Sequence, residues 1–256
     1  MNILFIGDIV GKVGRKALKE NLQTVKEKYD IDFVIANGEN ISKGKGMSEN
    51  HYHFLVDIGV DCVTLGNHYK DKDDTVGFLD FYDNICRPLN IKEKVPGVGS
   101  IVFDVDGILI RVTNLLGEAY SSIEVTNPYE EISKIIQDDV SDIHIVDFHA
   151  EATGEKKAFA YALRNTVSAV IGTHTHVQTS DEEILPLGTG YITDVGMTGP
   201  ICSVLGVKKE ISIKRMKNRM PVRFENATGP CKMECAVFDV DEKTGKTRAI
   251  ERFRLK

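Results

Sequence analysis

The sequence lacks the features that mark membrane-spanning proteins and small disulfide-rich proteins. No window approaches the roughly 18 consecutive apolar residues that a membrane-spanning helix needs. The five cysteines are odd in number and scattered along 256 residues, so they do not suggest a disulfide framework. The first ten residues, MNILFIGDIV, are apolar but contain no basic residue and are interrupted by Asp8, which predicts a strand and not a signal peptide. These absences predict a cytoplasmic protein with no membrane partner.

Repeats, low-complexity linkers and an excess of positive charge are also missing. The net charge of −6 argues against bulk binding of nucleic acid, although it leaves anionic substrates open because bound metal ions can dominate the charge of a site. The 42% hydrophobic and 27% charged residues are ordinary for a globular protein. We predict one domain over residues 1–256, with a candidate cap at 197–231. Cys231 and Cys235 have a spacing that a metal could use, but ordinary thiols are the favoured interpretation.

Five apolar, β-branched runs each end just before residues that could bind a metal. These residues are Asp8 after the run 3–6, Glu39 and Asn40 after 33–36, Asn67 and His68 after 62–65, His149 after 143–148, and His174 and His176 after 169–171. If the runs are neighbouring strands, their carboxyl ends lie along one edge, where open α/β sheets place their active sites. The set predicts a site for a pair of metal ions.

The order of elements predicts a mixed α/β architecture. Strands at 32–37 and 61–66 alternate with helices at 15–29 and 48–58, which favours parallel strands with right-handed crossovers. Later segments predict hairpins at 101–112 and 234–255, helices at 128–137 and 156–165, and strands at 143–148 and 168–172. Together they indicate two sheets with helices outside. A basic helical stretch at 204–218 is interpreted first as a solvated face and second as a cap that contacts substrate phosphate.

The roles of the candidate ligands follow from their donor atoms. In an extended segment, residues two apart point to the same side, so His174 and His176 could face one site and serve different metals. Glu39 has the two oxygens that a bridging ligand needs. A structural alternative remains for Asp8, which could cap the following helix, and for Glu39 and Asn40, which could be loop-forming residues.

Asn67 and His68 form the most informative pair. Asn67 offers a neutral carbonyl oxygen to a metal, and His68 can then point toward a substrate and protonate a leaving oxygen. The alternative is that His68 only orients other ligands. Three other histidines, His51, His53 and His144, receive no functional role. Mixed carboxylate, amide and imidazole ligands suit Fe, Mn or Zn, and two such ions can clamp a phosphoryl group for in-line displacement by activated water.

The motifs GD, NGEN, GNH, DFHAE and GTHTHVQT, together with GKGMSE, ITDVGMTGP, SVLG and PVRFE, extend over nearly the whole chain. In this combination the sequence resembles the calcineurin-like metallophosphoesterases, specifically their YmdB-type bacterial branch. The resemblance implies a four-layer α/β/β/α sandwich with two mixed β-sheets. It also implies a phosphodiesterase that acts on 2′,3′-cyclic nucleotides or an RNA end, with iron as the first choice of metal and Mn or Zn as alternatives. A homo-oligomer, dimer or tetramer, is implied as well.

The resemblance also assigns roles to residues. It implies one metal held by Asp8, Glu39, Asn40 and His176, a second held by Glu39, Asn67, His149 and His174, and His68 as the proton donor. The wider superfamily usually has a His shortly after the first Asp and an Asp as bridging ligand, whereas this chain has Ile9-Val10 and Glu39. Within the branch, the residues after GNH and near 116–118 also depart from the usual pattern, here Tyr69-Lys70-Asp71 and Leu116-Gly117-Glu118, so substrate-binding residues are not assigned.

Two other functions stay open at this point. The metals could be structural in a regulatory protein that binds RNA or protein, which the altered 69–70 and 116–118 segments and the basic 208–219 stretch would permit. A dinuclear hydrolase of another bond, such as an amide, would use the same ligand chemistry.

Overall fold

The computed structural model describes residues 1–219 and 221–256, without the side chains at 73 and 74. The helices of this described part are α1 (Gly11–Tyr29), α2 (Glu49–Asp57), α3 (Asp73–Phe78), α4 (Pro128–Gln137), α5 (Thr153–Ala162) and α6 (Lys209–Asn218). The strands are β1 (Asn2–Ile6), β2 (Asp8–Ile9), β3 (Phe33–Asn37), β4 (Cys62–Thr64), β5 (Ile85–Cys86), β6 (Ser100–Val105), β7 (Ile108–Leu116), β8 (Ile143–His149), β9 (Ala169–Thr173), β10 (Glu183–Ile184), β11 (Gly190–Ile192), β12 (Met197–Pro200), β13 (Cys231–Val240) and β14 (Thr247–Leu255).

The strands form two mixed sheets. The first has the order β2-β12-β13-β1-β3-β4-β5, with β14 paired to β13. Within it β1, β3, β4 and β5 are parallel, and β13 is antiparallel to β1. The second has the order β10-β11-β9-β8-β7-β6, in which β7, β8, β9 and β11 are parallel. In each sheet the carboxyl ends of the parallel strands therefore reach a single edge.

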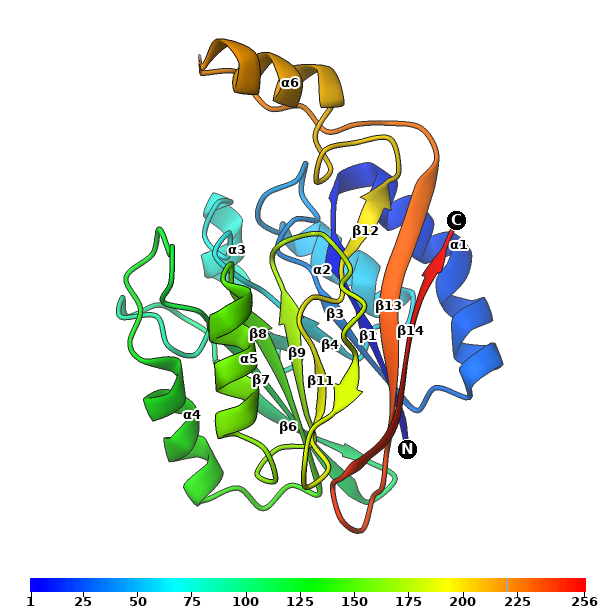
Figure 1. Ribbon diagram of the computed structural model, residues 1–256, viewed down its shortest axis with the longest axis vertical. Helices are drawn as coiled ribbons and strands as arrows, with labels where there is room; N and C mark the ends of the chain where they lie inside the picture. The colour runs from blue at the N-terminus through cyan, green and yellow to red at the C-terminus, as the bar shows by residue number, and fades with distance from the viewer. Residues whose placement is uncertain (220) are drawn as a thin grey trace.

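Alternation along the strands divides the core into layers. On β1, Ile3 and Phe5 enter the core between the two sheets, whereas Leu4 and Ile6 pack beneath the helices on the other face. Helices α1 and α2 cover that outer face of the first sheet, with Leu18 of α1 fully buried. Figure 1 shows the two sheets packed face to face.

Helices α4 and α5 cover the outer face of the second sheet. Ile132 of α4 and Phe159 of α5 pack in one cluster with Phe148 of β8. The rings of Phe148 and Phe159 stack with centroids 4.1 Å apart. With the helices on the first sheet, this completes the four-layer α/β/β/α arrangement of two mixed sheets, so the predicted fold class is confirmed.

Two predicted helix starts are wrong. Helix α1 begins at Gly11 and not at residue 15, and Gly14 is buried inside it; a Cβ on Gly14 would meet the Thr198 carbonyl oxygen at 2.4 Å. The missing side chain of Gly14 permits close packing of α1 on β12. The predicted helix at 156–165 is α5, which runs three residues earlier at both ends.

The predicted helix at 204–218 is shorter than expected. Residues Val204 and Val207 form an antiparallel bridge, so α6 begins at Lys209. No residue of α6 is buried, and in Figure 1 the helix stands clear of the sandwich at the top of the view. Residues 197–200 are β12, a strand of the first sheet, so any cap begins after Pro200. Within the described residues, no helix has both the length and the apolar character needed to cross a membrane.

Candidate active site

The candidate ligands meet where the carboxyl edges of the two sheets face each other. Glu39 follows β3 in the first sheet, and His149 is the last residue of β8 in the second. Glu39 Oε1 lies 3.1 Å from His149 Nε2, which joins the two edges directly. The expectation of five neighbouring strands along one edge is therefore corrected: β1, β3 and β4 belong to one sheet, and β8 and β9 to the other.

One group of side chains centres on His149. Its Nε2 atom lies 2.9 Å from Asn67 Oδ1 and 3.0 Å from His174 Nδ1, in addition to its contact with Glu39. One ligand atom each from Glu39, His149 and His174 can be chosen so that all lie within 4.8 Å of one another. Glu39 and His149 are buried, whereas Asn67 and His174 are partly exposed. This arrangement has the compactness of a metal centre with an open side.

A second group lies on the other side of Glu39. The side-chain nitrogen of Asn40, Nδ2, is 2.9 Å from Glu39 Oε1, 3.3 Å from Asp8 Oδ1 and 3.3 Å from His176 Nε2. His176 Nε2 is 3.6 Å from Asp8 Oδ1, and the Asp8 carboxylate is fully buried. Since Glu39 contacts members of both groups, it has the position that a bridging ligand would need.

The hydrogen bonds around His149 favour a cation in this cluster. Thr173 Oγ1 donates to Asp147 Oδ1 at 2.6 Å, so His149 Nδ1 donates its proton to Thr173 Oγ1 at 2.8 Å. In a neutral ring, His149 Nε2 would then turn a lone pair toward the Glu39 carboxylate at 3.1 Å, and a proton or a metal ion between the two atoms removes that repulsion. The donor set of carboxylate, amide oxygen and imidazoles suits a first-row transition metal, so the residues fit the implied metal.

Without a metal, a proton can take the place of the cation, and the pKa values of the cluster describe this metal-free state. Burial alone would lower the pKa of His149, but the charge of Glu39 outweighs it and raises the value to about 9. Burial would raise the pKa of Glu39, but the charge and hydrogen bond of His149 lower it to about 2. Burial and the neighbouring His149 lower the pKa of His174 to about 4, so its ring stays neutral. A metal would displace the proton on His149, since ligand imidazoles must be neutral.

The backbone that carries His174 and His176 is not extended, contrary to the prediction. β9 ends at Thr173, and His174 and His176 have φ angles of +100° and +62°, in the region that side chains rarely occupy. These turns send His174 toward His149 and His176 toward Asp8, so the two rings do reach different groups. Left-handed conformations of this kind persist only where neighbouring structure holds them.

A buried ion pair supports this strained segment. Lys156 of α5 and Asp194 are both fully buried, with Nζ 2.8 Å from Asp194 Oδ2. Lys156 Nζ also donates to the Thr173 carbonyl at 2.7 Å, and Asp194 Oδ2 accepts from the Thr175 amide at 3.0 Å. The pair thus holds the backbone on both sides of His174.

Sequence reasoning missed this support, although a signal for it was present. Lys156 shares the helical spacing of Phe159 and Ala160, the other buried positions of α5, and of the buried Leu163 that follows the helix. A lysine on an apolar helix face needs a buried partner. The Asp147–Thr173 contact to His149 was missed for a different reason, since Asp147 looked like part of an apolar strand.

His68 lies beside the ligands but differs from them in its contacts. Its backbone N–H donates to Glu39 Oε2 at 2.9 Å, while its ring Nδ1 lies 2.7 Å from Asp71 Oδ2. Gly66 lies just before this pair, and a Cβ there would meet Glu39 Oε2 at 2.3 Å and His149 Nε2 at 2.5 Å. The absence of a side chain at Gly66 therefore lets the loop approach the cluster, and it leaves the His68 ring outside the group around His149.

A family model described as YmdB-like protein matches residues 4–253. The chain belongs to the YmdB-like protein family. Over its whole length it is 44% identical to the 2′,3′-cyclic-nucleotide 2′-phosphodiesterase of Bacillus subtilis and covers 97% of that protein. This confirms the family resemblance seen in the motifs.

Solved structures agree with this membership. The structure of a novel phosphatase from Mycoplasma pneumoniae is similar with a TM-score of 0.95 and 40% identity, over 100% of this chain and 93% of that one. The structure of a hypothetical protein from Thermus thermophilus gives a TM-score of 0.94 and 35% identity, over 100% and 99%. The YmdB-like chain therefore shares its whole fold with these proteins.

The departures of this YmdB-like chain near 69–70 have a structural explanation. Tyr69 is fully buried, and its hydroxyl donates to Glu93 at 3.5 Å. Lys70 also pairs with Glu93. Both residues are thus occupied by packing and pairing, away from the ligand cluster. From the sequence alone, this segment was a candidate for altered contacts with the substrate.

The 116–118 segment of the YmdB-like chain does border the site. Leu116, Gly117 and residues 119–122 line a cavity of about 170 Å³ together with Asn67, His149 and His174. Glu155 Oε1 accepts from the Glu118 amide at 2.6 Å and so holds this loop. Glu151, which also lines the cavity, contacts His174 Nε2 at 3.1 Å. The cavity gives direct access to one side of the candidate metal centre.

We expect Lys156→Met to destabilise the metal-free protein by about 3–5 kcal/mol, because it leaves Asp194 buried and unpaired. Lys157→Met, at an exposed neighbouring position that pairs with Glu183, serves as the matched control. Urea unfolding would measure the change.

The double variant Lys156→Met/Asp194→Leu should regain stability but bind metal roughly 10- to 100-fold more weakly, because the segment around His174 loses its support. Wild-type metal affinity in the double variant would show that the pair has no positioning role.

Proposed function

We propose that this chain is a metal-dependent phosphodiesterase that hydrolyses 2′,3′-cyclic nucleotides. The observation that supports it most is a compact group of metal-binding side chains: Glu39, Asn67, His149 and His174. A second group, Asp8, Asn40 and His176, lies on the other side of Glu39. Family membership and the named B. subtilis relative support the same reaction class. Iron and a dimer or tetramer remain predictions from the resemblance.

In this proposal Glu39 would be the ligand shared by two metal ions. Asp8, Asn40 and His176 complete one set of ligands, and Asn67, His149 and His174 complete the other. When bound, the ions would lower the pKa of a water molecule and neutralise charge that builds on the phosphoryl oxygens. The chain itself contributes a buried, rigid ligand frame, held by Asp147 through Thr173 and by the buried ion pair beneath the His174 segment.

His68 supplies the proton in this proposal. Asp71 accepts from Nδ1 at 2.7 Å, which orients the ring, so Nε2 is the ring atom left to give a proton to the leaving oxygen. The backbone N–H of His68 is tied to Glu39, which fixes the distance between the proton donor and the ligand cluster. Both hydrogen bonds of His68, one from its ring and one from its backbone, support its role as a proton donor held in place beside the ligands.

Anaerobic purification with elemental analysis, followed by a substrate panel, tests the function. We expect about two transition-metal ions per chain and turnover of adenosine 2′,3′-cyclic phosphate that exceeds turnover of a simple monoester such as p-nitrophenyl phosphate. Chelation should abolish the activity, and re-addition of the metal should restore it. A metal-replete protein that hydrolyses no phosphoester would contradict the proposal and favour the regulatory alternative. Turnover of an amide and not of a phosphoester would favour the other hydrolase.

A further inference from the structure

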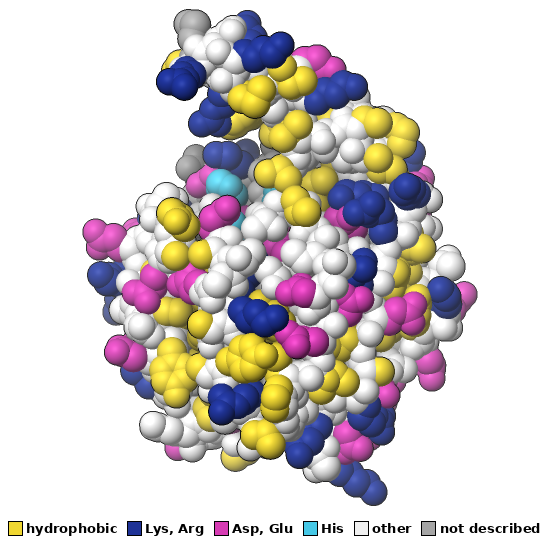
Figure 2. Space-filling model, in the orientation of Figure 1, with side chains coloured by type: hydrophobic (Ala, Val, Ile, Leu, Met, Phe, Trp, Pro, Cys, Tyr) yellow, Lys and Arg dark blue, Asp and Glu magenta, His cyan; other side chains and the backbone are white. Residues whose placement is uncertain are grey.

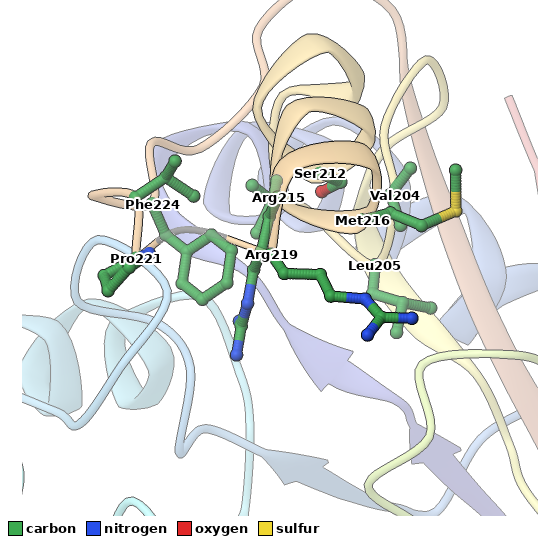
Figure 3. Close-up of a pocket in the computed structure, with 10 residues that line it drawn as sticks. Val204, Leu205, Ser212, Arg215, Met216, Arg219, Pro221 and Phe224 are labelled. Carbon is green, nitrogen blue, oxygen red and sulfur yellow. The ribbon is translucent and has the colours of Figure 1, made fainter.

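A second cavity lies under α6, apart from the ligand cluster. It has a volume of about 820 Å³ and is lined by residues of the α6 segment, which we define as 204–219 and 221–224. Its walls include Leu205, Arg215, Met216, Arg219 and Phe224. Figure 3 shows Arg215 and Phe224 side by side, extending from the segment toward the sheet edge below. The volume is within the range of small-molecule sites.

The cavity adjoins the candidate metal centre. Leu205, one of its walls, has a backbone carbonyl that accepts from His176 Nδ1 at 3.1 Å. Nearby, Ala227 N donates to the Gly206 carbonyl at 2.8 Å, and Val207 bridges to Asn226, so the base of the segment is anchored at this edge. In Figure 2, histidine side chains are visible in the hollow between the α6 segment and the body of the molecule. A molecule bound at the metal edge can therefore extend into the cavity.

The chemistry of the walls combines apolar surface with positive charge. Leu205, Met216 and Phe224 are 49%, 71% and 44% exposed, although large apolar side chains are normally covered. The guanidinium of Arg215 lies 4.9 Å from the centre of the Phe224 ring. In the part of the chain that the structure describes, neither Arg215 nor Arg219 pairs with a carboxylate.

The α6 segment also carries an excess of positive charge. Residues 204–225 contain seven basic and two acidic residues in a chain whose net charge is −6. The hollow also brings an aromatic ring and an arginine side chain together. An anionic ligand with a flat, apolar part matches both properties of the walls.

We propose that the α6 cavity is the subsite for the nucleobase and ribose of a nucleotide substrate. The inference rests on the proposed function, since it takes the phosphate of that nucleotide to lie at the candidate metal centre. The base packs on Phe224 and the apolar wall near Leu205, while Arg215 and Arg219 attract the anion and donate to polar atoms of the base. Aromatic side chains bind bases by stacking with little dependence on sequence, so the subsite selects nucleotides over small phosphodiesters.

The test compares a substrate that has a base with one that has none. Steady-state kinetics of adenosine 2′,3′-cyclic phosphate and of methyl p-nitrophenyl phosphate would be measured for the metal-loaded wild type, Phe224→Ala and Arg215→Ala. We expect KM for the cyclic nucleotide to rise about tenfold in each variant, with kcat and the values for the small diester within about threefold of wild type. Lys214→Ala and Ile213→Ala, on α6 but outside the cavity lining, are the matched controls and should change neither substrate.

A binding measurement makes the test independent of turnover. Calorimetry should show adenosine 3′-phosphate binding about tenfold more weakly to Phe224→Ala than to wild type, while inorganic phosphate binds both equally. If Phe224→Ala and Arg215→Ala lost activity equally on both substrates, or lost none on the cyclic nucleotide, the subsite would be overturned. Turnover of the small diester without nucleotide turnover would overturn the subsite and the cyclic-nucleotide substrate, while the metal-dependent phosphodiesterase reaction would stand. No turnover of either substrate would instead remove the proposed function.

Discussion

Glu39→Ala is expected to empty both metal positions and to lower kcat by roughly 10³-fold or more. The Glu39 carboxylate contacts side chains of both groups, through His149 at 3.1 Å and Asn40 at 2.9 Å. Loss of the ions would remove several kcal/mol of transition-state stabilisation. Elemental analysis of the purified variant and turnover of a cyclic nucleotide are the measurements.

The controls for Glu39 separate metal loss from misfolding. Glu93→Ala makes the same change at an exposed carboxylate that pairs with Lys70, and it should keep both metals. Circular dichroism of Glu39→Ala should show native secondary structure, because the sandwich core does not depend on this side chain. If Glu39→Ala retained two ions per chain, the bridging assignment would be lost. If it retained one, Glu39 would belong to a single metal.

His68→Ala is expected to keep its metals and to lose about 10²- to 10⁴-fold in kcat for a cyclic nucleotide. Its ring contacts Asp71 and not the ligand group around His149, so metal content should stay at the wild-type level. The loss should be much smaller for methyl p-nitrophenyl phosphate, because p-nitrophenolate leaves without protonation. That difference between leaving groups identifies an acid, whereas a residue that only orients ligands would slow both substrates alike.

Two further variants complete the test of His68. Asp71→Asn replaces the carboxylate that holds Nδ1 by a weaker acceptor, so it should reproduce part of the loss in kcat for the cyclic nucleotide. His53→Ala, at a histidine of α2 that contacts Tyr82 on the exposed surface, should behave as wild type. Equal activity of His68→Ala and wild type on the cyclic nucleotide would remove His68 from the acid role.

The candidate ligands could be predicted because each lies directly after an apolar run, and that pattern is local. The four-layer fold class followed from the same runs and the family motifs. The division of those runs between two sheets was not predictable in this way, because it depends on long-range pairing: β13, from near the end of the chain, pairs with β1 at the start. An apolar run looks the same whichever sheet it joins.

The conformation at the two ligating histidines of GTHTH was also beyond local reasoning. Alternating residues usually indicate an extended segment, but φ at His174 is +100°. The conformation is held by Lys156 and Asp194, which lie 18 residues before and 20 residues after it in the chain. Local propensity describes what a segment prefers alone, and here the surrounding fold overrides that preference.

The face-to-face arrangement of the two carboxyl edges has a consequence for folding. Glu39 comes from one sheet, and His149 and His174 come from the other, so an ion shared among them would be a cross-link between the two layers. Near this site the layers are also joined by apolar packing and by the hydrogen bonds of Asp147 to Asn37 and Thr64. Any ligand that binds only the native state stabilises it by mass action, by about 4 kcal/mol at a thousandfold excess over Kd. The resistance of the sandwich to opening at this edge would then vary with the supply of metal, which makes the protein's lifetime as well as its chemistry a function of metal availability.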